Sequence, residues 1–212
     1  MGQLEMDGSA AALVPPRPTI PKLRAAAAGC QACPLWRTGT QTVFGEGAPR
    51  ADAIFVGEQP GDQEDLEGRP FVGPAGKLLD KAMVEAGIDR SQAYVTNVVK
   101  HFKWQARGRR RIHQKPSWSE IAACRPWLDN EIAVLGPRVL VCLGATAAQA
   151  LLGRQFRVSK QRGELVESPL APNVIATVHP SSILRADAET REVEYAEFVR
   201  DLQKVAVLIR AG

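Results

Sequence analysis

The fold of this 212-residue chain is decided by the stretch Ala53-Ile54-Phe55-Val56-Gly57-Glu58-Gln59-Pro60-Gly61-Asp62. Its first five residues are apolar or small, which is typical of a strand buried on both faces, and Pro60-Gly61 marks a sharp turn behind it. Strands of this kind belong to parallel sheets, which helices cover on both sides. The stretch therefore predicts an α/β protein.

The rest of the chain repeats this alternation of strand and helix. Apolar runs predict further strands, and periodic segments predict helices, one of which opens with the capping box Ser117-Trp118-Ser119-Glu120. We expect a three-layer α/β/α fold with a central four-stranded, mostly parallel sheet. The expected strands are 53–57, 92–97, 139–144 and 173–178, and the expected helices are 19–28, 76–86, 117–136, 145–152 and 189–209.

Length and composition indicate one domain. We expect residues 1–18 to be a flexible tail, because Pro15, Pro16 and Pro18 oppose regular structure, and residues 19–212 to form the domain. No run of about 18 apolar residues occurs, and no basic segment is followed by an apolar one, so we expect a cytoplasmic protein without a membrane segment. We also expect a monomer.

The basic residues gather in the stretch 98–116. It holds seven of the 27 lysines and arginines, two of the three histidines and no acidic residue. Cations this close together repel one another, and here Phe102 and Trp104 are interleaved with them, as on surfaces that bind nucleic acid. A basic cluster alone is equally compatible with a solvated loop or a localisation signal.

Polar residues follow the ends of the predicted strands. Ligands of parallel sheets bind beyond the carboxyl ends of the strands, so we expect these residues to converge on one rim. Each of them has an ordinary alternative as a turn or helix-capping residue. They are Glu58, Gln59 and Asp62 after the first strand, Asn97 after the second, Gly144 after the third, and His179, Ser181 and Ser182 after the fourth.

Six motifs follow one another along the chain: Gly57-Glu58-Gln59-Pro60-Gly61, residues 68–76, Thr96-Asn97-Val98-Val99-Lys100, residues 123–128, Leu143-Gly144 and residues 179–185. Together they resemble, in order, the motifs of the iron–sulfur uracil-DNA glycosylases, over a match from about Cys30 to Arg185. Gln59 and the arginine-rich insertion ending in Arg109-Arg110-Arg111-Ile112-His113 resemble the UdgX branch, whose members form a covalent bond to DNA at the uracil site. Hydrolytic relatives carry Ala at the position of Gln59 and lack the insertion.

This resemblance implies a 4Fe–4S cluster. Cys30 and Cys33 have the two-residue gap that lets two thiolates reach one metal centre, and Cys124 matches a third ligand of the family. Where the family has its fourth cysteine this chain has His101, so the expected ligands are Cys30, Cys33, His101 and Cys124. Cys142 lies within an apolar strand and is expected to be a buried hydrophobe. A zinc site would satisfy the same ligand chemistry.

The resemblance also implies roles at the site. Phe71 would stack on uracil, Asn97 would hydrogen-bond its edge, and His179 would face O2. Glu58 would stabilise the cation that forms at C1′, and His113 would attack that carbon, with its pKa lowered by Arg109, Arg110 and Arg111. Gln59 and Asp62 are expected at the substrate. The expected DNA contacts are Lys100, Arg109, Arg110, Arg111, Ser181, Ser182 and Arg185.

Three functions are consistent with the sequence. The first is a glycosylase that excises uracil from DNA and stays attached through His113. The second is a turnover uracil-DNA glycosylase in which His113 only contacts DNA. The third is a non-catalytic metal-containing DNA-binding module or an electron carrier, for which Glu58, Asn97 and His179 at one rim would have no use.

Overall fold

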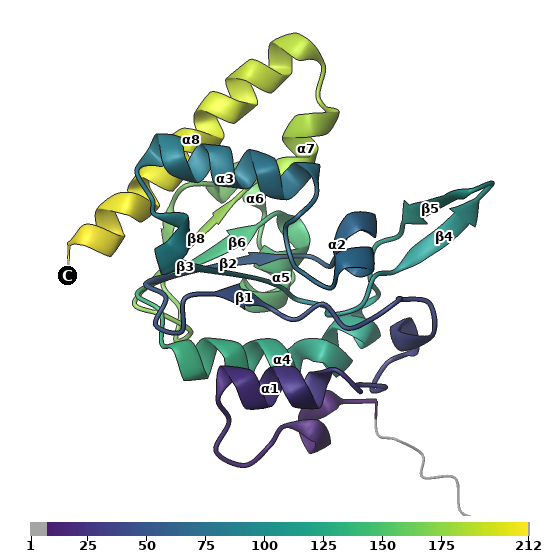
Figure 1. Ribbon diagram of the computed structural model, residues 1–212. Coiled ribbons are helices and arrows are strands. Elements are labelled where there is room, and N and C mark those ends of the chain that lie inside the picture. The colour runs from purple at the N-terminus through teal and green to yellow at the C-terminus, as the bar shows by residue number, and fades with distance from the viewer. Residues whose placement is uncertain (1–7, 212) are drawn as a thin grey trace, which may run out of the picture.

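The computed structural model describes residues 8–211 and confirms the three-layer α/β/α fold (Figure 1). Its central sheet has the strand order β1-β3-β2-β6-β8-β7. The four predicted strands form the middle of this sheet and run parallel to one another. These strands are β2 (Ala53–Gly57), β3 (Ala93–Asn97), β6 (Val139–Leu143) and β8 (Asn173–Thr177).

The expected number of four strands is too low, because a short strand extends each edge of the sheet. β1 (Glu46–Gly47) pairs antiparallel with β3, and β7 (Leu165–Val166) pairs antiparallel with β8. A two-residue strand carries no alternation of apolar and polar residues, so sequence patterns do not reveal it.

The side chains of β2 show how the layers form. Ile54 and Val56 pack with Trp127 on the face covered by α1, α4 and α5, whereas Phe55 packs with Leu79 on the face covered by α3 and α8 (Figure 1). Successive residues of a strand point to opposite faces, so a continuous apolar strand is buried by both helical layers. The helices are α1 (Ile20–Ala27), α2 (Asp62–Glu67), α3 (Pro74–Ala86), α4 (Trp118–Leu135), α5 (Ala145–Leu152), α6 (Val158–Gln161), α7 (Pro180–Arg185) and α8 (Ala188–Arg210), with 3-10 helices at Ala10–Leu13, Pro34–Arg37 and Arg90–Gln92.

The segment before α1 differs from the expected flexible tail. Ser9 caps the 3-10 helix Ala10–Leu13, and Ala10 is fully buried in the core cluster that contains α4. The predicted boundary at residue 18 is therefore wrong for residues 8–18, because burial of small apolar side chains holds them on the domain. Residues 1–7 lie outside the described part of the chain.

The basic stretch 98–116 forms a β-hairpin rather than a loop. β4 (Trp104–Arg107) pairs antiparallel with β5 (Arg110–His113), and the turn between them places Gly108 at a φ of 59°. The hairpin projects from the carboxyl end of the sheet beside α2 (Figure 1). Its strands are short and mostly exposed, and they consist largely of charged and polar residues. They therefore lack the alternation of apolar and polar residues by which a strand is predicted.

Between residues 8 and 211, none of the helices combines the length and the apolar composition that crossing a bilayer requires.

Candidate active site

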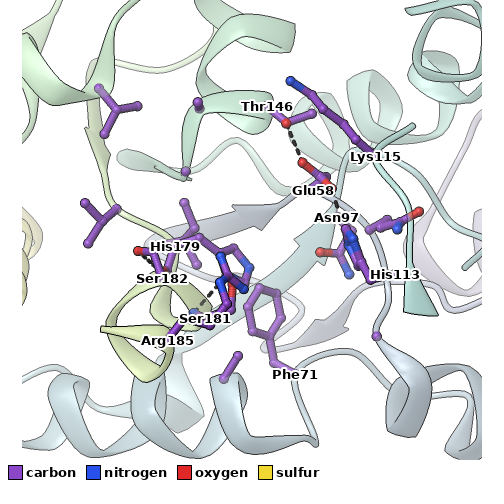
Figure 2. A pocket seen from close by; sticks show the side chains of 18 of the residues that line it. Glu58, Phe71, Asn97, His113, Lys115, Thr146, His179, Ser181, Ser182 and Arg185 are labelled. Atoms are coloured by element: carbon purple, nitrogen blue, oxygen red, sulfur yellow. Dashed lines mark hydrogen bonds and ion pairs between the residues drawn. The ribbon is translucent and has the colours of Figure 1, made fainter. Parts of the chain in front are cut away.

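A pocket of about 800 Å³ opens at the carboxyl ends of the parallel strands (Figure 2). It collects half of the eighteen predicted site residues, which come from the ends of three parallel strands, the loop before α3, the hairpin and α7. The predicted residues that line it are Glu58, Gln59, Phe71, Asn97, His113, His179, Ser181, Ser182 and Arg185.

Asn97 and Phe71 converge over Gly57. Asn97 ends β3 opposite Gly57, and its side chain is buried. A Cβ atom on Gly57 would collide with Asn97 Oδ1 and lie 2.8 Å from Phe71 Cζ, so only glycine leaves room for both groups. Phe71 itself has a φ of 57°, a left-handed conformation that costs a non-glycine residue about 1–3 kcal/mol. The fold therefore spends stability to hold an aromatic ring against an amide in this pocket.

His179 is held as a neutral hydrogen-bond donor. The backbone N–H of Ser181, which can only donate, lies 3.1 Å from His179 Nδ1, and Ser181 Oγ lies 2.8 Å from the same nitrogen. Nδ1 is therefore an acceptor, and the ring proton resides on Nε2. Burial lowers the pKa of His179 to about 4, and the positive charge of Arg185 contributes. The ring stacks 6.0 Å from that of Phe71.

Glu58 is fixed through both of its oxygens. Oε1 lies 3.3 Å from His113 Nε2, and Oε2 accepts a hydrogen bond from the hydroxyl of Thr146 in the first turn of α5 (Figure 2). Thr146 was not predicted, although its position just after the third strand end was a usable signal. Because strand β2 and helix α5 each place one of these groups, the carboxylate has a defined orientation toward His113.

The pKa of His113 is lowered, as expected, but not by the expected residues. Partial burial is the main cause, Arg185 lowers the pKa further, and Glu58 raises it. Arg109 and Arg110 lie exposed at the hairpin turn, and Arg111 is neutralised by acidic residues. The prediction that the neighbouring arginines set this pKa is therefore wrong, because burial, Glu58 and Arg185 are the groups that shift it.

Gln59 lines the pocket, but its amide is committed to the hairpin. Its Nε2 donates to the carbonyl oxygens of Gln114, at 2.9 Å, and Lys103, at 3.2 Å, while its Oε1 accepts from the backbone N–H of Lys103 at 2.9 Å. These bonds close the base of the hairpin, beyond both strands. The contact of Gln59 with substrate stays a prediction, and in this structure its amide ties the hairpin base, next to His113, to the turn after β2.

Arg111 and Asp62 form an internal clamp. Arg111 Nη1 lies 2.6 Å from the buried Asp65, and its Nε lies 2.5 Å from Asp62. The guanidinium also lies over the rings of Phe102 and Trp104. Asp62 does not line the pocket and its carboxylate is paired with Arg111, so its role at the substrate stays a prediction, and Arg111 is occupied rather than open to a phosphate.

Lys100 was predicted to contact DNA, and this is wrong. Its side chain is 1% exposed, and Nζ lies 2.5 Å from Glu131, 2.6 Å from Thr96 Oγ1 and 2.8 Å from the carbonyl oxygen of Asn97. Tyr94 donates to the other oxygen of Glu131. All three donors of the ammonium are used in the core, which is how a buried cation becomes tolerable.

The two predicted serines act locally. Ser182 Oγ donates to the carbonyl oxygen of His179 at 2.8 Å, and Ser181 orients the His179 ring. His179 is the N-cap of α7, so both hydroxyls contact the capping residue, while Arg185, at the end of the same helix, is exposed at the pocket. Lys115 and Glu64, which were not predicted, also line the pocket.

The cysteines divide as expected between one cluster and one strand. Cys30, Cys33 and Cys124 are buried in one core region. Burial raises the pKa of Cys33 and of Cys124, and the nearby thiol of Cys30 raises both further. The N–H groups of Trp127 and Lys100 lie 3.3 Å from the sulfurs of Cys30 and Cys124. Cys142 lies inside β6, where burial raises its pKa to about 12.

The donor chemistry of these three cysteines fits an iron–sulfur cluster, since N–H donors directed at sulfur stabilise thiolate ligands. The predicted fourth ligand, His101, is also buried. Its Nε2 lies 3.0 Å from the hydroxyl of Thr42. Among residues 8–211, no three His, Cys, Asp or Glu side chains are grouped closely enough to hold a metal ion. The ligand set of three cysteines and one histidine therefore stays a prediction, and the imidazole of His101 contacts Thr42 in this structure.

The parallel sheet, covered by helices on both faces, makes this an α/β protein. Its pocket brings together an amide, a neutral histidine and a carboxylate, a set of groups typical of an enzyme active site. Residues 44–203 match the model of the family described as the uracil DNA glycosylase superfamily, and the chain belongs to this superfamily. The six-stranded sheet and the pocket described above lie mainly within this matched range.

Relatives and a solved structure agree with this assignment. The chain is 41% identical to the type-4 uracil-DNA glycosylase of Thermotoga maritima, over 74% of this chain and 78% of that protein. It is 37% identical to the type-4 enzyme of Sulfurisphaera tokodaii, over 78% and 76%. The crystal structure of Pedobacter heparinus SMUG2 shares the fold, with a TM-score of 0.53, 13% identity, and coverage of 74% and 76%.

Proposed function

We propose that this protein excises uracil from DNA by cleaving the N-glycosidic bond. The observation that carries the proposal is the convergence of Asn97, His179 and Glu58 on one pocket beside the ring of Phe71. The named activity of the type-4 relatives supports it. A non-catalytic DNA-binding module or an electron carrier would not need these three groups together.

Base recognition is assigned to Phe71 and Asn97. A base must leave the helical stack to enter such a pocket, and an aromatic ring can replace the stacking it loses. The Asn97 amide offers an N–H donor for uracil O4 and a carbonyl acceptor for N3–H. Cytosine presents the reverse pattern at these positions, so Asn97 would reject it.

Departure of the base is assigned to His179. When the bond between C1′ and N1 breaks, its electron pair goes to the uracil ring, and negative charge develops on O2. The Nε2 proton of neutral His179 can donate to this oxygen, as a donor in an oxyanion hole does. Because the pKa of His179 is low, its imidazole is already neutral at neutral pH and does not have to lose a proton before this step.

The carboxylate of Glu58 would stabilise the cation left at C1′. Two outcomes follow from its contact with His113. In the first, neutral His113 carries its ring proton on Nδ1 and uses the lone pair of Nε2 to form a bond with C1′ as the bond between C1′ and N1 breaks. The imidazolium that forms then loses its Nδ1 proton to water, which leaves DNA attached to the protein. In the second, Glu58 takes a proton from water, and the resulting hydroxide completes hydrolysis. The 3.3 Å contact and the Gln59 staple favour the first outcome.

We further propose that Cys30, Cys33 and Cys124, together with His101, hold a 4Fe–4S cluster. Such a cluster would connect the N-terminal segment to α4 and to the end of β3, and none of the steps above passes through it. Iron and sulfide should be found in the purified protein at about the ratio of a cluster. Stoichiometric zinc without iron would refute the assignment.

A denaturing gel tests the reaction. The protein is incubated with a labelled oligonucleotide containing one uracil, and with a matched oligonucleotide containing thymine. Uracil release, measured separately, is expected only from the first. A heat-stable protein–DNA band that accompanies release supports capture by His113, whereas release of many uracils without such a band supports hydrolysis.

A further inference from the structure

A second basic segment borders the pocket, in addition to the hairpin. Residues 153–163 contain four basic residues and no acidic one, and no acid occurs between Glu131 and Glu164. The segment follows α5 and includes α6. Val158 and Ser159, from its middle, line the pocket itself. Its charges therefore lie at the edge of the cavity that would receive the base.

Three of the four cations in this segment face solvent. Arg162 is turned inward, with Nη1 2.7 Å from Glu194 and Nε 3.1 Å from Asp201 on α8. Arg154, Arg157 and Lys160 are exposed, and none of them forms an ion pair within the described residues. Arg157 meets only the carbonyl oxygens of Arg154 and Phe156. Three charges thus remain uncompensated on one side of the pocket.

This segment is continuous with the end of the hairpin stretch. The guanidinium of Arg154 lies 4.6 Å from the ring centroid of Trp118, the first residue of α4. Lys115, three residues earlier, is exposed and lines the pocket (Figure 2). A guanidinium over an aromatic ring keeps its N–H edge available for a phosphate. Arg154 therefore lies beside the end of the hairpin stretch, and we refer to the exposed residues Lys115, Arg154, Arg157 and Lys160 as one band.

The usual explanation, a solvated helix face, fits this band poorly. Exposed cations elsewhere are often paired with acids, as Lys81 is with Glu85 and Arg200 with Glu197. Glu120, which follows the hairpin stretch in the sequence, is used by Lys103 and by the cap of α4. A run of unpaired positive charge at a pocket mouth raises the local concentration of a polyanion.

We propose that Arg154, Arg157 and Lys160 bind the backbone of the DNA strand that carries the target base. The strand crosses the pocket mouth, with the hairpin cations holding phosphates on one side of the flipped nucleotide and this segment holding phosphates on the other. The inference rests on the proposed function, since it takes the pocket to be the site of the base. It gives the enzyme a second anchor, distant in sequence from the hairpin.

The test measures how binding depends on salt. The full-length protein is titrated with a fluorescent single-stranded oligonucleotide carrying 2′-fluoro-2′-deoxyuridine, whose electron-withdrawing fluorine disfavours the cation at C1′ and so prevents excision. Lys160→Ala is the principal variant, because the side chain of Lys160 is exposed and forms no hydrogen bond or ion pair within residues 8–211. Arg50→Ala is the matched control, since Arg50 is exposed just before β2, at the amino ends of the parallel strands and so on the side opposite the pocket.

We expect Lys160→Ala to reduce the slope of log affinity against log salt by about 0.7, the value for one phosphate contact on a single strand. Lys160→Ala combined with Arg157→Ala should lose about twice as much, and Arg50→Ala should match the wild type. An oligonucleotide shortened stepwise on each side of the uracil should lose the Lys160 effect from one side only.

The proposal that this segment binds the DNA backbone would be overturned by unchanged slopes in Lys160→Ala and in its combination with Arg157→Ala. An equal change in Arg50→Ala would also overturn it. Uracil release by the wild type, measured separately, tests the proposed function. Uracil release together with unchanged salt slopes would reject only the binding of DNA by this segment. Reduced salt slopes without any uracil release would support a DNA-binding surface and reject the glycosylase activity.

Discussion

His113 Nε2 lies 3.3 Å from Glu58 Oε1, although 54 residues separate them in the chain. One residue ends a hairpin strand, and the other follows the central strand of the sheet. The contact depends on Gln59, which ties the hairpin base to the turn after β2. A potential nucleophile is thus held at the carboxylate that would stabilise its target.

Replacing His113 should separate excision from attachment. His113→Ala removes the imidazole but leaves Glu58, Asn97 and His179, so uracil release should continue with turnover while the covalent band disappears. His113→Ser is expected to behave in the same way, because a hydroxyl can position water. Gel and uracil-release assays on the same samples measure both outcomes, and an adduct that persists in His113→Ala would assign attachment to a different residue.

Gln59→Ala should loosen the hairpin without removing a group that contacts the base. We expect the ratio of covalent adduct to released uracil to fall by roughly tenfold, because misplacing a nucleophile by about 1 Å has effects of this size or larger. Arg109→Ala serves as the control, since Arg109 is exposed at the hairpin turn and should alter salt dependence rather than this ratio. An unchanged ratio in Gln59→Ala would show that the hairpin holds its position without the staple.

Thr146→Val should slow excision, because Glu58 loses the hydrogen bond that orients its second oxygen. A hydrogen bond to a charged group contributes about 1.5–3 kcal/mol, which corresponds to a loss of roughly tenfold or more in the single-turnover rate. Thr146→Ser retains the hydroxyl and should restore most of the rate. If both variants are equally slow, the methyl group of Thr146 matters through packing and the hydrogen bond does not.

Acidification should affect attachment before release. The pKa of His113 is lowered from its usual value, so its imidazole stays neutral somewhat below pH 6.5 and is protonated as the pH falls through that lowered pKa. Protonation removes the lone pair that attacks C1′. His179 remains neutral until the pH approaches about 4. Adduct per released uracil should therefore decline with pH while release continues, and a constant ratio from pH 8 to 5 would contradict this order.

Lys100→Met should destabilise the fold instead of weakening DNA binding. It leaves Glu131 buried without its partner, at a cost of about 3–5 kcal/mol in the free energy of unfolding. Adding Glu131→Gln should recover part of the loss, because Tyr94 and Thr96 can still bond a neutral amide. Denaturant unfolding measures both variants. A stable Lys100→Met protein with a reduced salt slope would return Lys100 to the DNA surface.

The sequence by itself determined the parallel core and the residues at its strand ends. Apolar runs such as Ala53–Gly57 have no stable place except between two helical layers, and side chains after parallel strands must share an edge. Glu58, Asn97 and His179 could therefore be placed together before any coordinates. The helix α4 was also predictable, because its capping box and terminal glycine are local signals.

Only the tertiary structure decided what each charged side chain does. Lys100, Arg111 and Arg109 belong to one basic stretch, yet the first is buried on Glu131, the second clamps Asp62 and Asp65, and the third is exposed. The staple formed by Gln59 and the turning of His101 toward Thr42 are likewise contacts between distant segments. A local pattern specifies the type of side chain and its strand or helix, whereas pairing depends on which distant groups the fold brings within hydrogen-bonding distance.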